Sequence, residues 1–284
     1  MTKPNNKNHN DNYHMGLIGN GRTGALVRRD ATLVFACLPD FDSGSVFCSL
    51  LDDERGGEMG VSMVGGKPVA QHYREHTNIL VTRFEGKDGS FEVIDFMPRY
   101  RMAGRHEVPY APPDIVRVLK PTGGAPRVRI NYQPALEYGR YETKSRQLRD
   151  GLYKSTTVGK TAGVSHYESA YLYTDLPEPN ILQAKAFTLE HDEHLMLTYN
   201  DKLHPIDGER IRLLLAQTEA YWLGWSRSTH APGRYREHIL RSALALNPDL
   251  VLLITRTIQR TGDAAAWGGG RQEFLEELDA LNPR

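Results

Sequence analysis

A glycine-rich run near the start of the chain places the tightest constraint on its fold. Gly19, Gly21 and Gly24 satisfy the G-x-G-x-x-G spacing of a dinucleotide-binding loop. Such a loop needs a leading strand and a following helix, whose N-terminal N–H groups bind the pyrophosphate. After Gly24 come a short apolar run, a polar turn at residues 28–30, and residues 32–38, which are rich in β-branched and aromatic side chains. The sequence therefore predicts strand, turn and strand, and a small dinucleotide-dependent enzyme is the less favoured interpretation.

Further motifs follow the glycine-rich run in a fixed order. They are Ile18-Gly19-Asn20, Ala25-Leu26-Val27, Cys37 to Ser43, Phe47 to Asp52, Gly56-Gly57, Val93 to Pro98, Ile115 to Val118, Pro134 to Tyr141 and Tyr221 to Trp225. Over residues 13–246, their order and spacing resemble the N-terminal domain of glycoside hydrolase family 15, the bacterial glucoamylase and trehalase family. The resemblance implies a large two-sheet β-sandwich that precedes a catalytic barrel in a protein that hydrolyses α-glucosides.

Two positions depart from the pattern of that family. Phe35 stands where the family usually has Trp, which keeps an aromatic ring in the strand but loses its N–H donor. Asp40 stands where the family usually has Arg, so a bidentate donor for carboxylates or sugar hydroxyls is replaced by a negative charge. Residue 40 therefore does not supply any role that the family gives to this arginine.

The middle of the chain has the pattern of short strands separated by turns. Asp88-Gly89 lies between two alternating runs, which is typical of a β-hairpin, and further strand-like runs include residues 164–174 and 182–190. Many short strands with no amphipathic helix between them predict an antiparallel sandwich. We therefore expect a mainly β fold over residues 13–205, after a disordered tail at residues 1–12 that is rich in Asn and Lys.

The period of the pattern changes from about residue 206. Apolar and aromatic residues now recur every three or four positions, as on one face of a helix. They are Ile211, Leu214, Leu215, Thr218, Tyr221, Trp222 and Trp225. Residues 236–246 and 250–259 predict two further helices, and residues 274–281 carry a last amphipathic pattern. The sequence thus predicts a helical linker and an atypical C-terminal segment over residues 206–284.

The resemblance places both catalytic glutamates of the family in an (α/α)6 barrel that follows the linker. Inverting hydrolysis needs two carboxyl groups about 6.5–9.5 Å apart. Arg241 to Leu246 resembles the end of the family's linker. In that family two further sequence segments follow the linker, and residues 247–284 match neither of them. They are also too few for a barrel of twelve helices. We therefore predict no catalytic residue in this chain and expect it to be inactive alone.

Asp40, Asp42 and Ser43 are the candidate substrate-binding residues. They follow a strand at a Pro turn, where Asp and Ser side chains commonly cap the turn through local hydrogen bonds. In the functional interpretation, they lie on a loop that borders a sugar site in a partner domain. Both interpretations fit the sequence.

Histidines occur in two short patterns that fit a metal site poorly. His191 and His194 lie in a predicted turn beside acidic residues, and His72 and His76 lack the order of a zinc protease motif. Asp95 is expected to cap the end of a strand. We predict no metal ligand and no cofactor.

Composition limits the class of partner. Lys plus Arg equals Asp plus Glu at 35 each, so the chain lacks the basic excess that nucleic acids or anionic membranes favour. No apolar run approaches the ~20 residues that cross a bilayer, and two cysteines, Cys37 and Cys48, suit a reducing cytoplasm.

The expected partners are a separate catalytic barrel, a second copy of the chain or an α-glucoside ligand. A carbohydrate-binding or partner-completing module is therefore an alternative function. The apolar face of the linker helices is expected to be covered by residues 250–281 or by a second copy.

Overall fold

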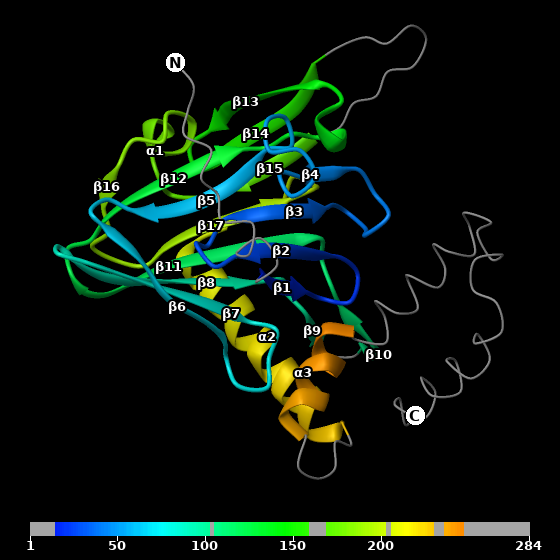
Figure 1. The fold of residues 1–284 in the computed structure, drawn as a ribbon. Helices are drawn as coiled ribbons and strands as arrows, with labels where there is room; N and C mark the ends of the chain where they lie inside the picture. Colours follow the sequence, from blue (N-terminus) through cyan, green and yellow to red (C-terminus); the bar gives the residue numbers. More distant parts are fainter. Residues whose placement is uncertain (1–14, 103–104, 159–168, 203–205, 230–235, 247–284) are drawn as a thin grey trace, which may run out of the picture.

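Two antiparallel β-sheets stack face to face in the computed structural model, which describes residues 15–102, 105–158, 169–202, 206–229 and 236–246 (Figure 1). The two longer helices follow the last strand in the chain, and the first of them lies against the second sheet. The predicted mainly β sandwich with C-terminal helices is confirmed. None of the helices within these ranges is long and apolar enough to span a membrane.

The first sheet, sheet A, has seven strands and contains the glycine-rich run. Its strands are β1 (Met15–Gly19), β2 (Gly24–Arg28), β3 (Leu33–Cys37), β4 (Ser45–Phe47), β5 (Glu58–Met63), β12 (Arg127–Gln133) and β16 (Phe187–Thr188). They pair in the order β1-β2-β3-β5-β12-β16, and β4 pairs with β3. Because β2 follows the glycine-rich loop directly, the predicted strand, turn and strand are confirmed, and this loop has no following helix to bind a pyrophosphate.

The second sheet, sheet B, has eight strands in the order β13-β14-β15-β17-β11-β8-β7-β6. They are β6 (Gly66–Tyr73), β7 (Leu80–Gly86), β8 (Gly89–Phe96), β11 (Asp114–Gly124), β13 (Glu142–Arg149), β14 (Leu152–Val158), β15 (Ser169–Tyr173) and β17 (Glu193–Thr198). The predicted Asp88-Gly89 hairpin joins β7 to β8. A separate two-stranded ribbon consists of β9 (Tyr100–Met102) and β10 (Arg105–Tyr110).

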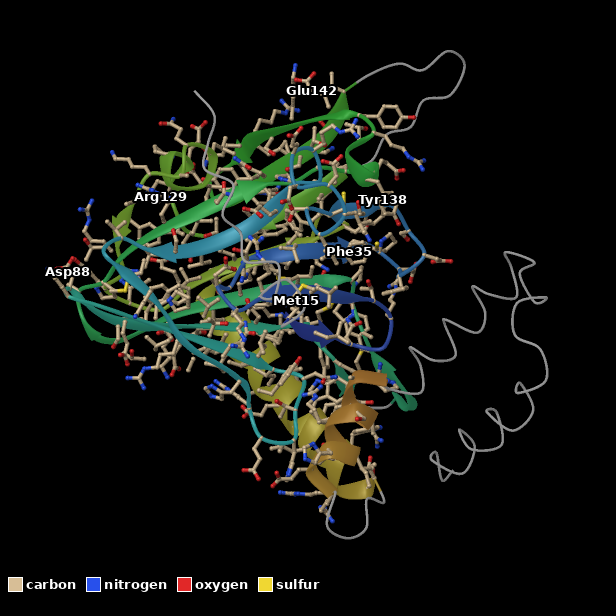
Figure 2. The ribbon with its side chains drawn as sticks, in the orientation of Figure 1. Met15, Phe35, Asp88, Arg129, Tyr138 and Glu142 are labelled. Atoms are coloured by element: carbon tan, nitrogen blue, oxygen red, sulfur yellow. The ribbon has the colours of Figure 1, made fainter. Side chains whose placement is uncertain are left out.

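The main hydrophobic core lies between the two sheets. Alternate residues of each strand point into it, and the rings of Phe84 and Phe91 stack there with their centroids 4.8 Å apart. The opposite face of sheet B forms a second core with α2 (Gly208–Ser228), to which Ile211 and Leu214 contribute. The central strands of sheet B are therefore buried on both faces. Asp88 and Tyr138 mark opposite ends of the sandwich (Figure 2).

A buried ion pair joins the sheets through this core. Arg117 on β11 and Asp95 on β8 are adjacent across the strands and fully buried, with Nε 2.7 Å from Oδ1 and Nη2 3.1 Å from Oδ2. The guanidinium also donates to the backbone carbonyls of Met59 on β5, at 2.6 Å, and of Ala31 before β3. The prediction that Asp95 caps a strand end is wrong, because its partner lies on a strand that is distant in sequence.

Two helices follow the sandwich where the period of the sequence predicts them. Asp207 caps α2 by accepting a hydrogen bond from the backbone N–H of Arg210 at 2.8 Å. The second helix, α3 (Arg236–Leu246), packs Leu240 and Leu244 against Trp222 of α2. The aromatic residues of α2 therefore serve to pack this helix against α3.

Part of the predicted strand at residues 182–190 is wrong. The chain instead forms α1 (Glu178–Leu182), which begins directly after Pro177, and then the short strand β16. The first N–H groups of a helix have no partner within it, so Pro, which has no N–H, fits this position. The prolines at the start of α1 therefore favour a helical turn. The predictions for residues 1–12, 164–168 and 250–281 fall outside the described residues.

Replacing Asp95 with Ala is expected to lower the free energy of unfolding by about 3–5 kcal/mol, because Arg117 would keep a buried charge with no carboxylate to balance it. Urea denaturation measures this change. The same substitution at the exposed Asp192 is the control and is expected to change stability by less than about 0.5 kcal/mol. Equal effects at both positions would contradict this account of the core.

Candidate functional site

The glycine-rich loop between β1 and β2 is held in place by one buried amide side chain. Asn20 is fully buried, and its Nδ2 donates to the backbone carbonyls of Pro98 at 3.2 Å and Pro112 at 2.7 Å. Its Oδ1 accepts from the backbone N–H groups of Arg22 and Thr23, at 3.1 and 3.3 Å. All four hydrogen bonds of the amide are therefore made within the protein.

This arrangement explains the glycine spacing without a nucleotide. Gly21 has a φ of 81°, a left-handed conformation that suits glycine in a hairpin turn. Thr23 Oγ1 donates to the carbonyl of Cys37 at 2.6 Å, which ties the loop to the end of β3. The three glycines and Asn20 thus form a rigid connection in the sandwich.

The candidate residue Asp40 pairs with an arginine of that loop. Arg22 Nε is 2.6 Å from Asp40 Oδ1 and Nη2 is 3.3 Å from Oδ2, with both side chains about two-fifths exposed. The hydrogen bond that Arg22 donates to Asp40 raises the pKa of Arg22, which therefore stays charged. A guanidinium is thus present beside residue 40, although residue 40 itself is acidic.

Ser43 and Asp40 also close the turn that contains Asp42. The backbone N–H of Asp40 donates to Ser43 Oγ at 3.1 Å, and the N–H of Ser43 donates to the carbonyl of Asp40 at 3.1 Å. Asp42 and its neighbour Phe41 are exposed at the tip. The turn-capping interpretation is confirmed for Ser43, and the same turn presents Phe41 and Asp42 to the outside.

The end of α3 lies beside these two loops. Asn78 Nδ2 donates to the carbonyl of Leu244 at 2.8 Å, and Arg241 donates to the carbonyl of Thr77 at 2.8 Å. A small cavity of about 30 Å³ separates Leu244 and Ala245 from Phe41, Gly21 and their neighbours. The chain therefore leaves the described fold next to the glycine-rich loop and the turn at residues 40–43.

A polar hollow of about 740 Å³ opens between the loops at residues 49–58 and 133–143. Its central carboxylate, Glu58, accepts from Arg28 Nη2 at 3.3 Å, Ser49 Oγ at 3.4 Å and Asn131 Nδ2 at 3.3 Å. Gly139 has a φ of 64° and lies so close to the carbonyl of Arg55 that a Cβ would be 2.6 Å from it. These packed loops offer several donors and acceptors to a polar ligand. The motifs Phe47 to Asp52, Gly56-Gly57 and Pro134 to Tyr141 fall in them, but sequence reasoning missed the hollow because nothing in the sequence shows that these segments lie together.

The predicted histidine patterns do not form a metal site in the described part of the chain, where no group of three or more His, Cys, Asp or Glu side chains converges. His72 lies on β6 and His76 in the turn that follows, so no helix brings them together. His191 is exposed and pairs with Glu193 at 3.0 Å. His194 is buried on β17, with Nδ1 3.7 Å from Asp175 Oδ2.

Burial lowers the pKa of His194, although the nearby carboxylates of Asp175 and Asp207 oppose the shift. Burial likewise raises the pKa of the Cys37 thiol, even though Tyr138 hydrogen-bonds its sulfur. A thiol that stays protonated is a poor nucleophile. Cys37 therefore lacks the properties of a catalytic nucleophile.

Comparison with known proteins agrees with this picture. The family described as "Trehalase-like, N-terminal" matches residues 8–165. A trehalase of Thermoplasma volcanium is 29% identical over 243 residues, which cover 82% of this chain and 36% of that protein. A trehalase of Thermoplasma acidophilum is 27% identical over 229 residues, which cover 78% of this chain and 37% of that protein. Trehalase 1 of Sulfolobus acidocaldarius is 32% identical over 168 residues, 59% of this chain and 26% of that protein.

The chain thus spans about a third of the length of the two Thermoplasma relatives. No solved structure matches it.

Replacing Asn20 with Ala is expected to lower the free energy of unfolding by about 3 kcal/mol, because buried carbonyls and N–H groups would lose their partners. Thermal or urea denaturation measures this loss. Arg22→Ala in the same loop is the control and is expected to cost no more than about 1 kcal/mol, since its ion pair is exposed. A mild effect at Asn20 would mean that the loop does not depend on this amide.

Replacing His194 with Gln is expected to weaken the dependence of stability on acid pH. Below about pH 6.5 the unfolded chain binds a proton that the buried imidazole does not, so the folded state loses stability as the pH falls toward its lower pKa. Melting temperatures measured between about pH 7 and pH 5 give the slope. The exposed His191→Gln variant is expected to keep the wild-type slope, and three equal slopes would contradict the prediction.

Proposed function

Because the chain belongs to the trehalase-like N-terminal domain family, we propose that it is the non-catalytic N-terminal domain of a glycoside hydrolase family 15 protein that hydrolyses α-glucosides. The names of the relatives, all trehalases, support an α-glucoside as the substrate of the lineage. Inverting hydrolysis needs two carboxyl groups about 6.5–9.5 Å apart on a rigid scaffold. On this proposal, a separate (α/α)6 barrel supplies both, and the chain alone is inactive.

The position of the end of α3 is the observation that carries the proposal. Leu244 and Ala245 lie beside Phe41 and the glycine-rich loop, so a catalytic domain that acts next to α3 meets these loops first. Phe41 and Asp42 are exposed there, and Asn20 holds the neighbouring loop rigid. Rigid loops with an exposed aromatic residue suit a contact between domains.

Within this contact, the turn at residues 40–43 has the role of a border to the sugar site. Arg22 provides a charged guanidinium at the turn, and Asp42 provides an exposed carboxylate. Both groups form hydrogen bonds with hydroxyls, so they suit an α-glucoside. Ser43 keeps the turn closed. We also propose a cytoplasmic location, on the two buried free cysteines, Cys37 and Cys48.

A second candidate function is a carbohydrate-binding module that acts with a separate catalytic domain. The polar hollow around Glu58 favours it, because the hollow of about 740 Å³ is lined by amide, hydroxyl, carboxylate and guanidinium groups. Arg28, Ser49 and Asn131 already hold Glu58, so the site would not need to rearrange. A pre-formed polar hollow lowers the cost of ordering a sugar.

The purified chain is expected to release no glucose from trehalose, maltose or isomaltose, with the intact trehalase of Thermoplasma volcanium as the positive control. Glucose release that a single Glu or Asp substitution abolishes would contradict the proposal. Calorimetric titration with trehalose and maltotriose separates the two candidate functions. Binding that Glu58→Gln weakens about five- to tenfold, while Asp42→Asn leaves it unchanged, favours the binding module.

A further inference from the structure

A groove of about 590 Å³ lies between α2 and the β9–β10 ribbon, outside both loop sites. Its floor consists of Ala220, Gly224 and Ser228, which are one helical turn apart along α2. Its walls are aromatic and come from Tyr100, Tyr221 and Trp225. Figure 1 shows α2 running behind the strands of sheet B toward α3, with β9 and β10 to the right of its lower part. The groove is therefore lined by small residues of one face of α2 and by aromatic side chains.

The walls are fixed by contacts within the fold. The guanidinium carbon of Arg99 lies 5.0 Å from the centroid of the Tyr221 ring, a cation–π geometry. The rings of Tyr100 and Tyr110 meet edge to face with their centroids 5.3 Å apart. Side chains that are already ordered lose little conformational entropy when something binds between them. The groove is thus pre-organised for an occupant.

Gly224 is the residue that the fold of the described residues does not explain. It lies within a 21-residue helix, where glycine costs about 1 kcal/mol relative to alanine. A Cβ at this position would meet no atom within 4 Å, so no contact in this part of the chain requires a bare backbone. The missing side chain leaves the floor low enough for a second element to approach α2 closely.

The following part of the chain starts close to this groove. Tyr221 and Trp225 pack against the cluster that Trp222 forms with Leu240 and Leu244, so the last turns of α3 lie beside the walls. Residues 247–284 follow α3 directly and are long enough to reach the groove many times over. The position of the end of α3 therefore favours a segment of this same chain as the occupant.

The sequence of residues 272–282, which lie outside the described residues, has the pattern that such a groove accepts. Apolar residues occur at spacings of one, three and four, as on one face of a helix: Phe274, Leu275, Leu278 and Leu281. About eleven residues of helix span about 16 Å, which equals the length of α2 from Gln217 to Ser228. The lengths of segment and groove therefore agree.

Charge also favours this occupant. Residues 272–282 contain four acidic residues and no Lys or Arg; the acids are Glu273, Glu276, Glu277 and Asp279. The exposed Arg101 lines the groove, and the exposed Arg227 lies in the last turn of α2 beside Ser228. Opposite charges at the border of an apolar contact favour the correct orientation and partner.

We propose that residues 272–282 bind in this groove as an amphipathic helix. Their apolar face lies on Ala220 and Gly224 between the aromatic walls, and their acids lie near Arg101 and Arg227. This contact covers the apolar face that α2 leaves between its aromatic residues. It is independent of whether the chain works with a catalytic barrel.

Hydrogen–deuterium exchange on the full chain tests the proposal. Residues 272–282 are expected to be protected in the wild type, and Gly224→Leu is expected to speed their exchange on the order of tenfold or more by filling the groove. The new side chain has free space and leucine favours helix, so α2 itself is expected to stay protected. Arg212→Leu places the same side chain on an exposed site of α2 outside the groove, and it is expected to keep residues 272–282 protected.

A variant of the occupant gives an independent check. Leu278→Glu places a charge on the apolar face of the segment and is expected to release it as Gly224→Leu does, without touching the groove. Loss of protection in both variants, with unchanged helix content by circular dichroism, supports the proposal.

Three results would overturn it. The first is that residues 272–282 exchange without protection in the wild type, or that Gly224→Leu leaves their protection unchanged. The second is a wild-type dimer in sedimentation that Gly224→Leu dissociates, since the occupant would then be a second copy. The third is binding of maltotriose that Gly224→Leu abolishes and Arg212→Leu does not, since the groove would then be a sugar site.

Discussion

The guanidinium of Arg117, buried between the two sheets, fixes how they stack. It pairs with Asp95 on the neighbouring strand of its own sheet and donates to the carbonyls of Met59 and Ala31 in the other. A buried charge is tolerated only where all its partners are in place, so any sliding of one sheet over the other leaves it uncompensated. Ala31 lies in the turn between β2 and β3, so the same bond holds the far end of β2, the strand that follows the glycine-rich loop. Hydrophobic packing alone tolerates a small shift of one sheet relative to the other more readily.

Local patterns predicted those parts of the fold that depend on neighbours in sequence. The run after Gly24 predicted a strand because its residues are β-branched and aromatic, and Asp88-Gly89 predicted a hairpin because both residues suit a tight turn. The three- and four-residue spacing along residues 211–225 predicted α2 for a similar reason. The strand pattern at residues 182–190 was a weaker guide, because Leu182 ends the helix α1 and only Phe187 and Thr188 form a strand.

The candidate site was less predictable because its decisive contacts join distant residues. Asn20 bonds to carbonyls 78 and 92 positions away, and Asp95 bonds to Arg117 across a strand pair, which no window of sequence can show. The acidic residue at position 40 marked a departure from the related family, but only the structure places Arg22 against it. The hollow around Glu58 was missed for the same reason, since Arg28 and the separate segments 49–58 and 133–143 provide its polar groups.

The two carbonyls that Asn20 binds bracket the β9–β10 ribbon, because Pro98 precedes β9 and Pro112 follows β10. One amide group therefore fastens both ends of the ribbon to the glycine-rich loop. Tyr100 of that ribbon is a wall of the groove on α2, so filling or emptying the groove acts on a ribbon whose ends the loop holds. A short series of contacts therefore connects the groove on α2 with the turn at residues 40–43: Tyr100 lies in the ribbon, Asn20 holds both ends of the ribbon, and Arg22 of the same loop pairs with Asp40.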